Sequence, residues 1–333
     1  MTSARVQPNQ QDMEYAYRVI GAISQEFAAK VVGQDYLRES LLIGLLTGGH
    51  ILLEGVPGLA KTTAARVIAD AVSGQFQRIQ CTPDLLPSDI IGTQIFNSTT
   101  NSFATQLGPV HANIVLLDEI NRSSAKTQSA MLEAMEERQT TIAGELHRIP
   151  EPFLVIATQN PVDQEGTYPL SEAQTDRFTL KEVLRYPSAQ DEVEMMMRID
   201  AGVYDRNEKP REVVGLDDIR RIQQTVRNVH MDPALVSYVS QLVQVTRNPQ
   251  QFLPPQLARL LEYGASPRAT IAFCRSARAL AVLSGRNHVV PDDIHKLAHR
   301  VLRHRLILGF EAAAANITSE TVIDAVLQSV RVP

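Results

Sequence analysis

The sequence predicts an α/β fold in which a parallel sheet lies between two layers of helices, followed by a smaller, all-helical domain. In the first half of the chain, short apolar runs alternate with segments whose apolar residues recur at helical spacing. This alternation is typical of a three-layer arrangement around a parallel sheet. In the second half, helical spacing persists between breaks rich in Pro, Gly and charge, which is the pattern of consecutive helices.

Strands and helices alternate through the first predicted domain. The predicted strands cover residues 50–54, 76–81, 113–118 and 153–158, and the predicted helices cover residues 12–30, 35–47, 61–73 and 125–137. The run at 113–118 is continuously apolar, as expected for a strand buried on both faces. We expect this domain to span residues 12–186, after a polar tail at residues 1–11.

A second, all-helical domain is predicted over residues 187–333. Its predicted helices cover residues 188–199, 216–228, 232–246, 267–284 and 291–305. Near its end, His295, His299 and His304 alternate with Lys and Arg in a basic helix. No Cys or acidic ligand accompanies the histidines and no aromatic residues are interleaved, so we interpret this helix as a solvated face or subunit contact.

The overall composition limits the classes of protein to which the chain can belong. The 333 residues are 44% hydrophobic and 21% charged, which fits a soluble globular chain of two domains. A formal net charge of −5 argues against a protein that coats nucleic acid. Cys81 and Cys274 form no metal or disulfide pattern, and the apolar stretch at 41–53 is too short for a bilayer. Because the first residues also lack the apolar run of a signal peptide, we expect a cytoplasmic protein without membrane insertion.

The segment Gly55-Val-Pro-Gly-Leu-Ala-Lys61-Thr62 lies between a predicted strand and a predicted helix. Small residues let backbone N–H groups converge on phosphate oxygens, and the helix that begins near Ala60 directs its positive end at the anion. Lys61 is expected to reach the β- and γ-phosphates of ATP, and Thr62 to offer its hydroxyl to Mg²⁺. The motif usually has Gly before the Lys, but a helix-entry position with right-handed dihedrals would accept Ala60. The alternative is an ordinary strand–turn–helix connection.

Polar side chains follow two later strands. Asp118 ends the predicted strand at 113–118 and Glu119 follows it, and Asn160 follows the strand at 153–158. Ligands bind at the carboxyl ends of parallel strands, so Asp118 is a candidate Mg²⁺ ligand, directly or through water, and Glu119 a candidate general base. Asn160 could orient the attacking water. By themselves, these residues could also be a solvated strand end and an Asn-Pro turn.

Two arginines are candidates to stabilise charge on a transferred phosphoryl group. Arg177 stands in Asp176-Arg177-Phe178, and Arg268 in Ser266-Pro267-Arg268 at the start of a predicted helix. The helix dipole disfavours a cation at that end, which favours an external anion as the partner of Arg268. The alternative for each arginine is a surface ion pair.

In this order, the motifs resemble the AAA+ ATPases, and more narrowly the MoxR family. The similar segments are the phosphate loop with Ala before Lys, Leu-Leu-Asp-Glu-Ile-Asn-Arg at 116–122, Ala-Thr-Gln-Asn-Pro at 157–161, the motif at 165–178 that ends in Asp-Arg-Phe, and Gly-Ala-Ser-Pro-Arg at 264–268. The resemblance covers about residues 12–330 and implies an AAA+ core with a phosphate loop, followed by a helical lid.

The resemblance also implies a role for each matching residue. Asp118 and Glu119 match the Walker B motif, Asn160 sensor 1, Arg177 the arginine finger that acts on ATP of a neighbouring subunit, and Arg268 sensor 2 on the lid. Val32-Gly33-Gln34 matches the segment near adenine. The residues expected to contact the nucleotide are Val32, Gly33, Gln34, Gly55, Val56, Pro57, Gly58, Leu59, Ala60, Lys61, Thr62 and Thr63.

Two insertions of the family are also matched. Residues 92–108 fit the helix-2 insert and residues 140–148, with Gly144 at the tip, fit the pre-sensor-1 hairpin. The family implies a homo-oligomeric ring, expected to be a hexamer, and a chaperone-like ATPase that remodels client proteins, often ones with a von Willebrand factor A domain. The alternatives are a nucleic-acid-associated motor or loader of the same superfamily and a nucleotide switch that does not hydrolyse ATP.

Overall fold

The computed structural model describes residues 7–161, 167–203 and 214–333. Parts of the predicted polar tail, of the motif that begins at Glu165 and of the segment between the predicted helices at 188–199 and 216–228 lie outside these residues. The chain forms two compact units. The sheet unit consists of residues 19–170 and 182–220, and the helical unit of residues 1–18, 171–181 and 221–333. The predicted α/β architecture followed by helices is confirmed.

The central sheet has five strands in the order β2-β5-β8-β1-β9. They are β1 (Ile51–Glu54), β2 (Phe76–Gln80), β5 (Ile114–Asp118), β8 (Leu154–Gln159) and β9 (Leu180–Val183). The pairs β1–β8, β2–β5 and β5–β8 are parallel. Four of the strands were predicted. The sequence analysis missed β9, because Lys181 and Glu182 interrupt its apolar residues.

The register brings the carboxyl ends of the strands to one edge of the sheet. Asp118 pairs with Gln80, and Gln159 pairs with Glu54. The residues that follow these strands therefore begin at the same edge, which is where an open parallel sheet binds ligands. Strands β5 and β8 are buried along almost their whole length, so the edge is built on a rigid core.

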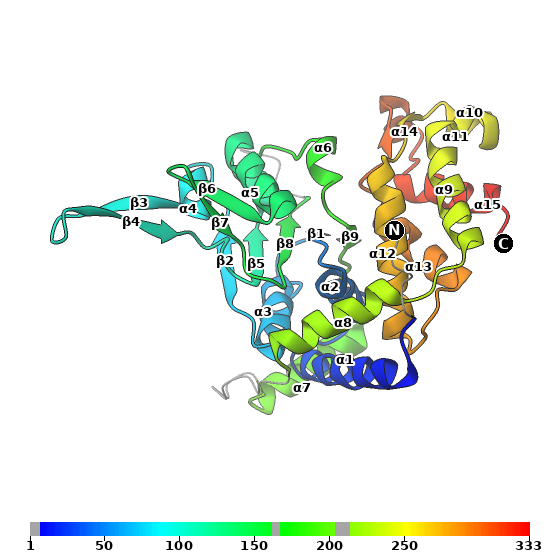
Figure 1. Ribbon diagram of the computed structural model, residues 1–333. Helices are drawn as coiled ribbons and strands as arrows, with labels where there is room; N and C mark the ends of the chain where they lie inside the picture. The colour runs from blue at the N-terminus through cyan, green and yellow to red at the C-terminus, as the bar shows by residue number, and fades with distance from the viewer. Residues whose placement is uncertain (1–6, 162–166, 204–213) are drawn as a thin grey trace, which may run out of the picture. The chain divides into compact units, whose positions relative to one another are not determined.

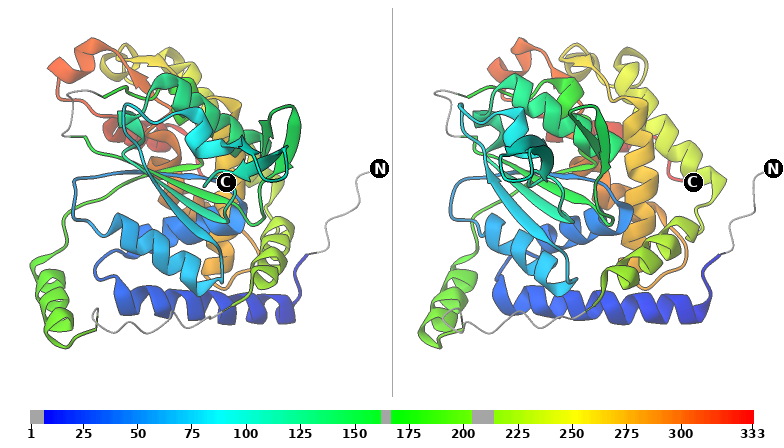
Figure 2. Two further views of the ribbon diagram at one scale, coloured as in Figure 1. Left: turned by 90° about the vertical axis from the view of Figure 1, so that its left-hand side faces the viewer. Right: turned by 60° about the vertical axis from the view of Figure 1, so that its left-hand side comes forward.

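Helices cover both faces of this sheet. The helices are α1 (Gln10–Lys30), α2 (Asp35–Thr47), α3 (Lys61–Ala71), α4 (Pro87–Ile91) and α5 (Ala125–Glu137), with a 3₁₀ turn at Ile120–Arg122. Figure 2 shows α2 and α3 on one side of the strands and α5 on the other. Helix α5 begins where Ser124 accepts a hydrogen bond from the backbone N–H of Thr127, which satisfies one of the free donors of its first turn.

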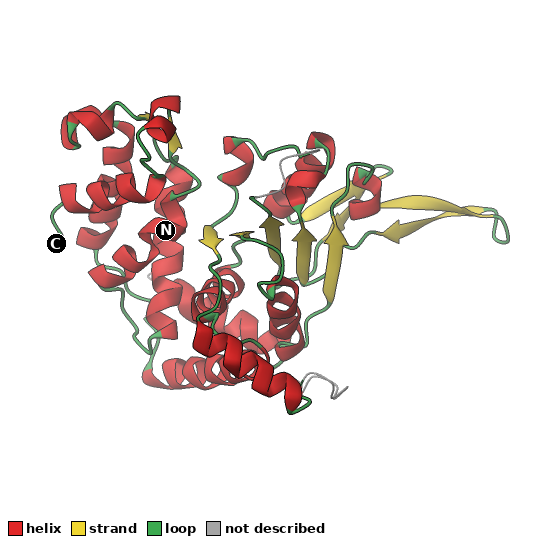
Figure 3. Ribbon diagram, turned by 180° about the vertical axis from the view of Figure 1, so that it is seen from behind, coloured by secondary structure: helices red, strands yellow, loops and turns green. Residues whose placement is uncertain are grey.

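Two hairpins extend from the sheet unit. One pairs β3 (Gly92–Asn97) with β4 (Ser102–Leu107), and the other pairs β6 (Gln139–Ile142) with β7 (Glu145–Arg148). The first projects well beyond the sheet (Figures 1 and 3). The second turns at Ala143 and Gly144, both with positive φ, as a two-residue hairpin loop requires. Both hairpins lie in the two segments that match family insertions.

Helix α7 (Ala189–Asp200) corrects one expectation about packing. The sequence Met195-Met196-Met197 predicts core residues, but Met196 and Met197 are more than half exposed. Their neighbours Val193 and Ile199 are exposed as well. The apolar side of α7 is therefore a surface of the sheet unit. Helix α8 (Leu216–Asn228) lies near the start of the next described part of the chain, residues 214–333.

The helical unit contains three of the predicted long helices and several shorter elements. The long helices are α9 (Pro233–Arg247), α12 (Pro267–Leu283) and α13 (Pro291–Leu302), and the shorter elements are α6 (Glu172–Thr175), α10 (Pro249–Phe252), α11 (Pro255–Ala258), β10 (Leu261–Tyr263), β11 (Ile307–Leu308), α14 (Phe310–Ala314) and α15 (Ser319–Ser329). Helix α15 was not predicted. Among the described residues, no helix is both long and apolar enough to cross a membrane.

Candidate functional site

The loop between β1 and α3 is closed by a hydrogen bond from the lysine at its end to the glycine at its beginning. Lys61 opens α3, and its ammonium donates a hydrogen bond to the carbonyl of Gly55 at 2.7 Å. The N–H of Gly55 in turn donates to the carbonyl of Gln159, at the end of β8. The loop is thereby held against the carboxyl edge of the sheet, with the first turn of α3 behind it. This is the strand–loop–helix context that a phosphate-binding loop needs.

The backbone of Ala60 contradicts the expectation for that position. A right-handed helix-entry conformation was expected, but Ala60 has φ 54° and ψ 22°, in the left-handed region. Gly58 also has a positive φ, 88°. The loop must turn its N–H groups inward before α3 begins, and this reversal requires left-handed dihedrals. A side chain there costs about 1 kcal/mol relative to glycine.

The two acidic residues after β5 are positioned by one buried hydroxyl. Thr158 on β8 accepts a hydrogen bond from the N–H of Glu119 at 2.8 Å and donates one to Asp118 Oδ1 at 2.9 Å. Its side chain is fully buried. Glu119 itself has a left-handed backbone, with φ 57°, which turns its carboxylate away from the strand direction. Thr158 thus fixes both carboxylates relative to the sheet.

Each carboxylate also has an arginine partner. Arg78 on β2 donates from Nε and Nη2 to Asp118 Oδ2 at 3.1 and 2.6 Å. Arg122 donates to Glu119 Oε2 at 3.1 Å. Sequence reasoning missed both arginines, although the predicted sheet could have placed Arg78 beside the strand that ends at Asp118.

The electrostatics link the acids to the loop lysine. Burial lowers the pKa of Lys61, while the charges of Asp118 and Glu119 act in the opposite direction and raise it. The three groups are therefore near enough to interact within one site. Cys81, at the end of β2, is also part of this region, and burial raises its pKa to about 12. It is buried and stays a neutral thiol at physiological pH.

The oxygen atoms of this region suit a magnesium ion. Mg²⁺ prefers carboxylate, hydroxyl and phosphate oxygens and keeps several waters. Asp118 accepts three hydrogen bonds, from Arg78 twice and Thr158 once, so about one of the four acceptor sites of its carboxylate is left. That leaves room for one metal-bound water or one direct bond. Thr62 is half-buried in the first turn of α3 and could supply the hydroxyl.

Asn160 follows β8 at the same edge. Its side chain is buried, with 6% of the residue exposed, which argues against a solvated turn. The preceding residue, Gln159, pairs with Glu54 and accepts the N–H of Gly55. Asn160 is thus carried next to the beginning of the phosphate-binding loop. Its function as an orienter of water stays a prediction.

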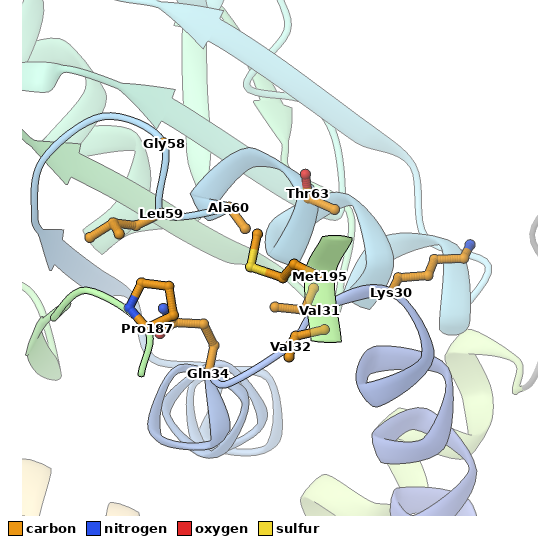
Figure 4. A pocket seen from close by; sticks show the side chains of 10 residues that line it. All are labelled: Lys30, Val31, Val32, Gln34, Gly58, Leu59, Ala60, Thr63, Pro187 and Met195. Atoms are coloured by element: carbon orange, nitrogen blue, oxygen red, sulfur yellow. The ribbon is translucent and has the colours of Figure 1, made fainter. Parts of the chain in front are cut away.

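A cavity of about 160 Å³ lies beside the loop. It is lined by Lys30, Val31, Val32, Gln34, Gly58, Leu59, Ala60, Thr63, Pro187 and Met195. Figure 4 shows that these side chains come from the end of α1 and the turn after it, from the phosphate-binding loop and the first turn of α3, and from α7 and the segment before it. The walls are mostly apolar, as expected for a pocket that takes a flat aromatic base. The predicted adenine segment and the predicted phosphate loop therefore share one cavity.

Arg177 and Arg268 belong to the helical unit, together with the residues that hold them. Arg177 follows α6, and Arg268 is in the first turn of α12. Asp176 connects the two segments, because its Oδ2 accepts a hydrogen bond at 2.7 Å from Ser266, the N-cap of α12. Sequence reasoning did not predict this connection, since Asp176 and Ser266 are 90 residues apart.

The basic helix near the C-terminus is only partly a solvated face. His295 contacts the hydroxyl of Tyr238 at 2.7 Å, and His299 pairs with Glu320 and Asp324 on α15. Arg300 and Arg305 are buried. The expectation of a solvated face or subunit contact is therefore wrong for these two arginines. Within the described residues, no three His, Cys, Asp or Glu side chains gather as a metal site.

Comparison with known proteins gives the context of this site. Residues 50–180 match the family model "ATPase family associated with various cellular activities (AAA)", and residues 257–326 match "AAA lid domain". The chain is 48% identical over 303 residues to Chaperone MoxR1 of Mycobacterium tuberculosis, covering 91% of this chain and 79% of that protein.

Two further relatives match nearly the whole chain. Protein MoxR of Methylorubrum extorquens is 31% identical over 326 residues, across 93% of this chain and 94% of that protein. The crystal structure of a candidate ATPase from Cytophaga hutchinsonii has a TM-score of 0.91 and 44% identity, and the match covers 97% of each chain. Both the sheet unit and the helical unit therefore have counterparts in a solved structure.

Proposed function

The chain belongs to the MoxR family of AAA+ ATPases, and on that premise we propose that it couples Mg²⁺-dependent ATP hydrolysis to the remodelling of client proteins. The observation that carries the proposal is that Lys61, bonded to Gly55 beside the end of β8, lies at the same carboxyl edge of the sheet as Asp118 and Glu119, which are bonded to Thr158 of β8. A cation for the phosphates, an acid for the metal and an acid for the water are the three parts that ATP hydrolysis requires.

Binding is assigned to the loop and the adjoining cavity. The base enters the apolar pocket lined by Val32, Leu59 and Met195, and the phosphates lie at the start of α3. Lys61 exchanges the carbonyl of Gly55 for a phosphate oxygen, a charge-assisted bond that is stronger than the one it leaves. Thr62 and Asp118 would hold Mg²⁺, and the ion would neutralise negative charge on the phosphates.

Hydrolysis is assigned to the edge of the sheet. Glu119 accepts a proton from the attacking water, and the amide of Asn160 orients that water. Arg122 holds Glu119 through a side chain that is itself 46% exposed, so this ion pair is weak and can release the carboxylate when a water binds. Arg177 and Arg268 supply positive charge to the γ-phosphate, Arg177 from a neighbouring subunit and Arg268 from the same one.

An arginine that acts across a subunit boundary requires an oligomer. A heterologous contact that repeats from subunit to subunit closes into a ring, and a hexamer is the form expected from the family. The hairpin β3–β4 is the part offered to a client, which we expect to be a cytoplasmic protein, including proteins with a von Willebrand factor A domain. No Asp, Glu, Lys or Arg occurs between Asp89 and Asp118. The hairpin thus lacks the positive charge that binds nucleic acid, which favours a protein client over a nucleic-acid motor.

The test is the substitution Glu119→Gln, which keeps the size of the side chain and removes the base. We expect this variant to bind ATP with near-normal affinity and to hydrolyse it at least about 100-fold more slowly. Lys61→Ala is the matched control, because it should lose ATP binding itself. Fluorescent-nucleotide titration and phosphate release measure the two steps. Wild-type turnover by Glu119→Gln would remove Glu119 from the role of base, and would leave a nucleotide switch as the better description.

A further inference from the structure

The segment that carries Arg177 has little regular structure to hold it in place. Helix α6 is four residues long and ends two residues before Arg177. The N–H of Arg177 donates to Gln174 at 3.3 Å, and that of Phe178 donates to Thr175 at 3.1 Å. A single helical turn is unstable by itself. The position of Arg177 must therefore be fixed by contacts from elsewhere in the helical unit.

Arg305, which follows α13, provides these contacts. Its guanidinium donates five hydrogen bonds, the full number that an arginine has N–H groups for. One goes to the carboxylate of Asp176 at 2.7 Å, and three go to the carbonyls of Asp176, Phe178 and Thr179 at 3.1, 2.6 and 3.3 Å. These carbonyls stand on both sides of Arg177. The fifth bond goes to Val301 in α13.

Two neighbours of Arg305 bind the same segment. The ring of His304 contacts the carbonyl of Phe178 at 3.0 Å, and Arg303 donates to the carbonyl of Lys181 at 3.1 Å. The hydroxyl of Thr175 donates to the carbonyl of His304 at 3.3 Å. The backbone from 175 to 181 is therefore attached to residues 303–305 along its length.

The same carboxylate also reaches the helix that carries Arg268. Asp176 Oδ2 accepts the hydroxyl of Ser266, and that hydroxyl accepts the N–H of Arg268 at 3.0 Å. One oxygen of Asp176 thus binds Arg305, and the other binds the N-cap of α12. The segments that carry Arg177 and Arg268 are therefore joined through the side chain of Asp176.

The ion pair between Arg305 and Asp176 is largely buried. The side chain of Arg305 is 2% exposed and that of Asp176 is 17% exposed. Burial lowers the pKa of the Arg305 guanidinium, Asp176 raises it, and the charge of Arg268 lowers it further. The guanidinium nevertheless keeps its proton, because arginine does not deprotonate in proteins. A buried charge of this kind is retained only where each donor has a partner, and no lysine could replace the planar set of five donors.

We propose that Arg305 and Asp176 are positioning residues that set Arg177 and Arg268 as one rigid assembly. The inference rests on the proposed function, in which Arg177 serves the nucleotide of the neighbouring subunit and Arg268 that of its own. Because one ion pair orients both, a movement of α12 that follows nucleotide binding in one subunit also moves the arginine that this subunit offers to the next. The pair is the physical link between consecutive sites of the oligomer.

The test compares Arg305→Lys with a matched ion pair elsewhere in the helical unit. Arg305→Lys keeps the charge but loses the bonds to the carbonyls around Arg177. The control is Arg286→Lys. Arg286 donates to the buried carboxylate of Asp293 at 2.9 and 2.6 Å, and none of its bonds reaches residues 171–181. Asp176→Asn is the second variant, which serves if Arg305→Lys does not fold. Thermal melting and the size of the oligomer are recorded for all variants.

We expect Arg305→Lys to lower kcat for ATP hydrolysis about 10- to 100-fold, the loss that follows when a group at the reaction is displaced by about 1 Å. The affinity for ADP should change less than about twofold, because ADP lacks the γ-phosphate that both arginines serve. Arg286→Lys should keep its kcat. In a background of Arg177→Ala, Arg305→Lys should add less loss than it causes by itself, because the part that acts through Arg177 is already removed and only the part that acts through Arg268 remains.

Three results would overturn the inference. They are a wild-type kcat in folded Arg305→Lys and Asp176→Asn, an equal loss of kcat in Arg286→Lys, or fully additive losses with Arg177→Ala. Failure of the proposed function is a different result. If Arg177→Ala and Glu119→Gln hydrolyse ATP normally, the assignment of the site is wrong, whatever Arg305→Lys does.

Discussion

The acid pair at the sheet edge and the arginine pair of the helical unit are supported in different ways. Asp118 and Glu119 follow a buried strand of a parallel sheet, so the backbone already fixes them, and one hydroxyl from Thr158 sets their direction. Arg177 follows a four-residue helix. One buried guanidinium, that of Arg305, donates three hydrogen bonds to backbone carbonyls around it and a fourth to the carboxylate of Asp176.

This difference shows that the number of side-chain contacts needed to position a functional residue depends on the secondary-structure element that carries it. A strand in the centre of a sheet is stabilised along its length by backbone pairing and burial, so little additional support is needed. A short turn has no such stability, and a dedicated side chain must satisfy its carbonyl groups. Under the proposed function, in which Arg177 serves another subunit, the acid pair would stay fixed while the arginine pair moves as a unit.

The largest expected effect tests whether the two pairs serve different subunits. Arg177→Ala subunits keep an intact acid pair, and Lys61→Ala subunits keep an intact Arg177. Each protein by itself should be inactive, with losses on the order of 10³-fold as for other arginine fingers. Mixed in one oligomer, the two should recover hydrolysis, because an Arg177 from one subunit then meets a working loop of another. Phosphate release across a series of mixing ratios measures the recovery.

The mixing experiment needs a control for subunit exchange. Arg177→Ala mixed with the double variant Lys61→Ala/Arg177→Ala should stay inactive at each ratio. If the original mixture also fails to recover while native gels show mixed oligomers, Arg177 acts within its own subunit or not at all. The inference that the acid pair and Arg177 serve different subunits would then be wrong.

A smaller effect is expected at Thr158, whose hydroxyl is hydrogen-bonded to both residues of the acid pair. Thr158→Val has nearly the same shape but removes the bonds to Glu119 and Asp118. We expect kcat to fall about 10- to 100-fold through misalignment of both carboxylates, and stability to fall by about 1–3 kcal/mol because a buried N–H loses its partner. Thr158→Ser should restore most of the activity. Steady-state kinetics and urea denaturation measure the two changes.

The matched control is Thr127→Val. Thr127 is buried, and its hydroxyl also makes two hydrogen bonds, to Ser124 and to the carbonyl of Leu85. It should lose similar stability and keep its kcat. A Thr158→Val enzyme that turns over at the wild-type rate would show that the strands alone position the acids, and would make the contrast between the two regions greater than we infer.

The same contrast explains what the sequence could predict. Residues 114–117 indicate a buried strand by their apolar side chains alone, and the two acids follow in the next positions. The loop at Gly55–Thr62 is likewise contained in eight consecutive residues. Local patterns of this kind are sufficient to predict the strands β1, β2, β5 and β8 and the loop that joins β1 to α3.

The remaining parts depend on contacts between distant residues. Asp176 and Arg305 are 129 positions apart, and nothing in either segment indicates the other. The basic pattern of the predicted helix at 291–305 favours a solvated face or subunit contact for Arg305, because charge within a helical segment usually faces water. Strand β9 was missed for a related reason, since its Glu182 is buried and bonded to Ser40 at 2.6 Å. A prediction from the spacing of apolar residues does not detect buried charges that have specific partners.

The smallest expected effect concerns Ala60, within the loop that the sheet edge supports. Ala60→Gly removes the strain of a side chain at φ 54°, worth about 1 kcal/mol, but it adds freedom to the unfolded chain, worth about 0.4–1 kcal/mol. The two terms nearly cancel, so the free energy of unfolding should rise by about 0.5 kcal/mol or less. ATP affinity should change less than about threefold, because the N–H groups keep their directions.

Ala143→Gly is the matched control for this last change. Ala143 has φ 50° in the turn between β6 and β7, so it has the same strain at a position outside the loop. Both variants should gain similar stability in urea denaturation, and only Ala60→Gly should affect nucleotide titrations. A loss of more than about 1 kcal/mol in Ala60→Gly alone would show that the methyl group of Ala60, which lines the cavity, stabilises the loop by packing. The loop would then require specific side-chain support, as the segment around Arg177 does.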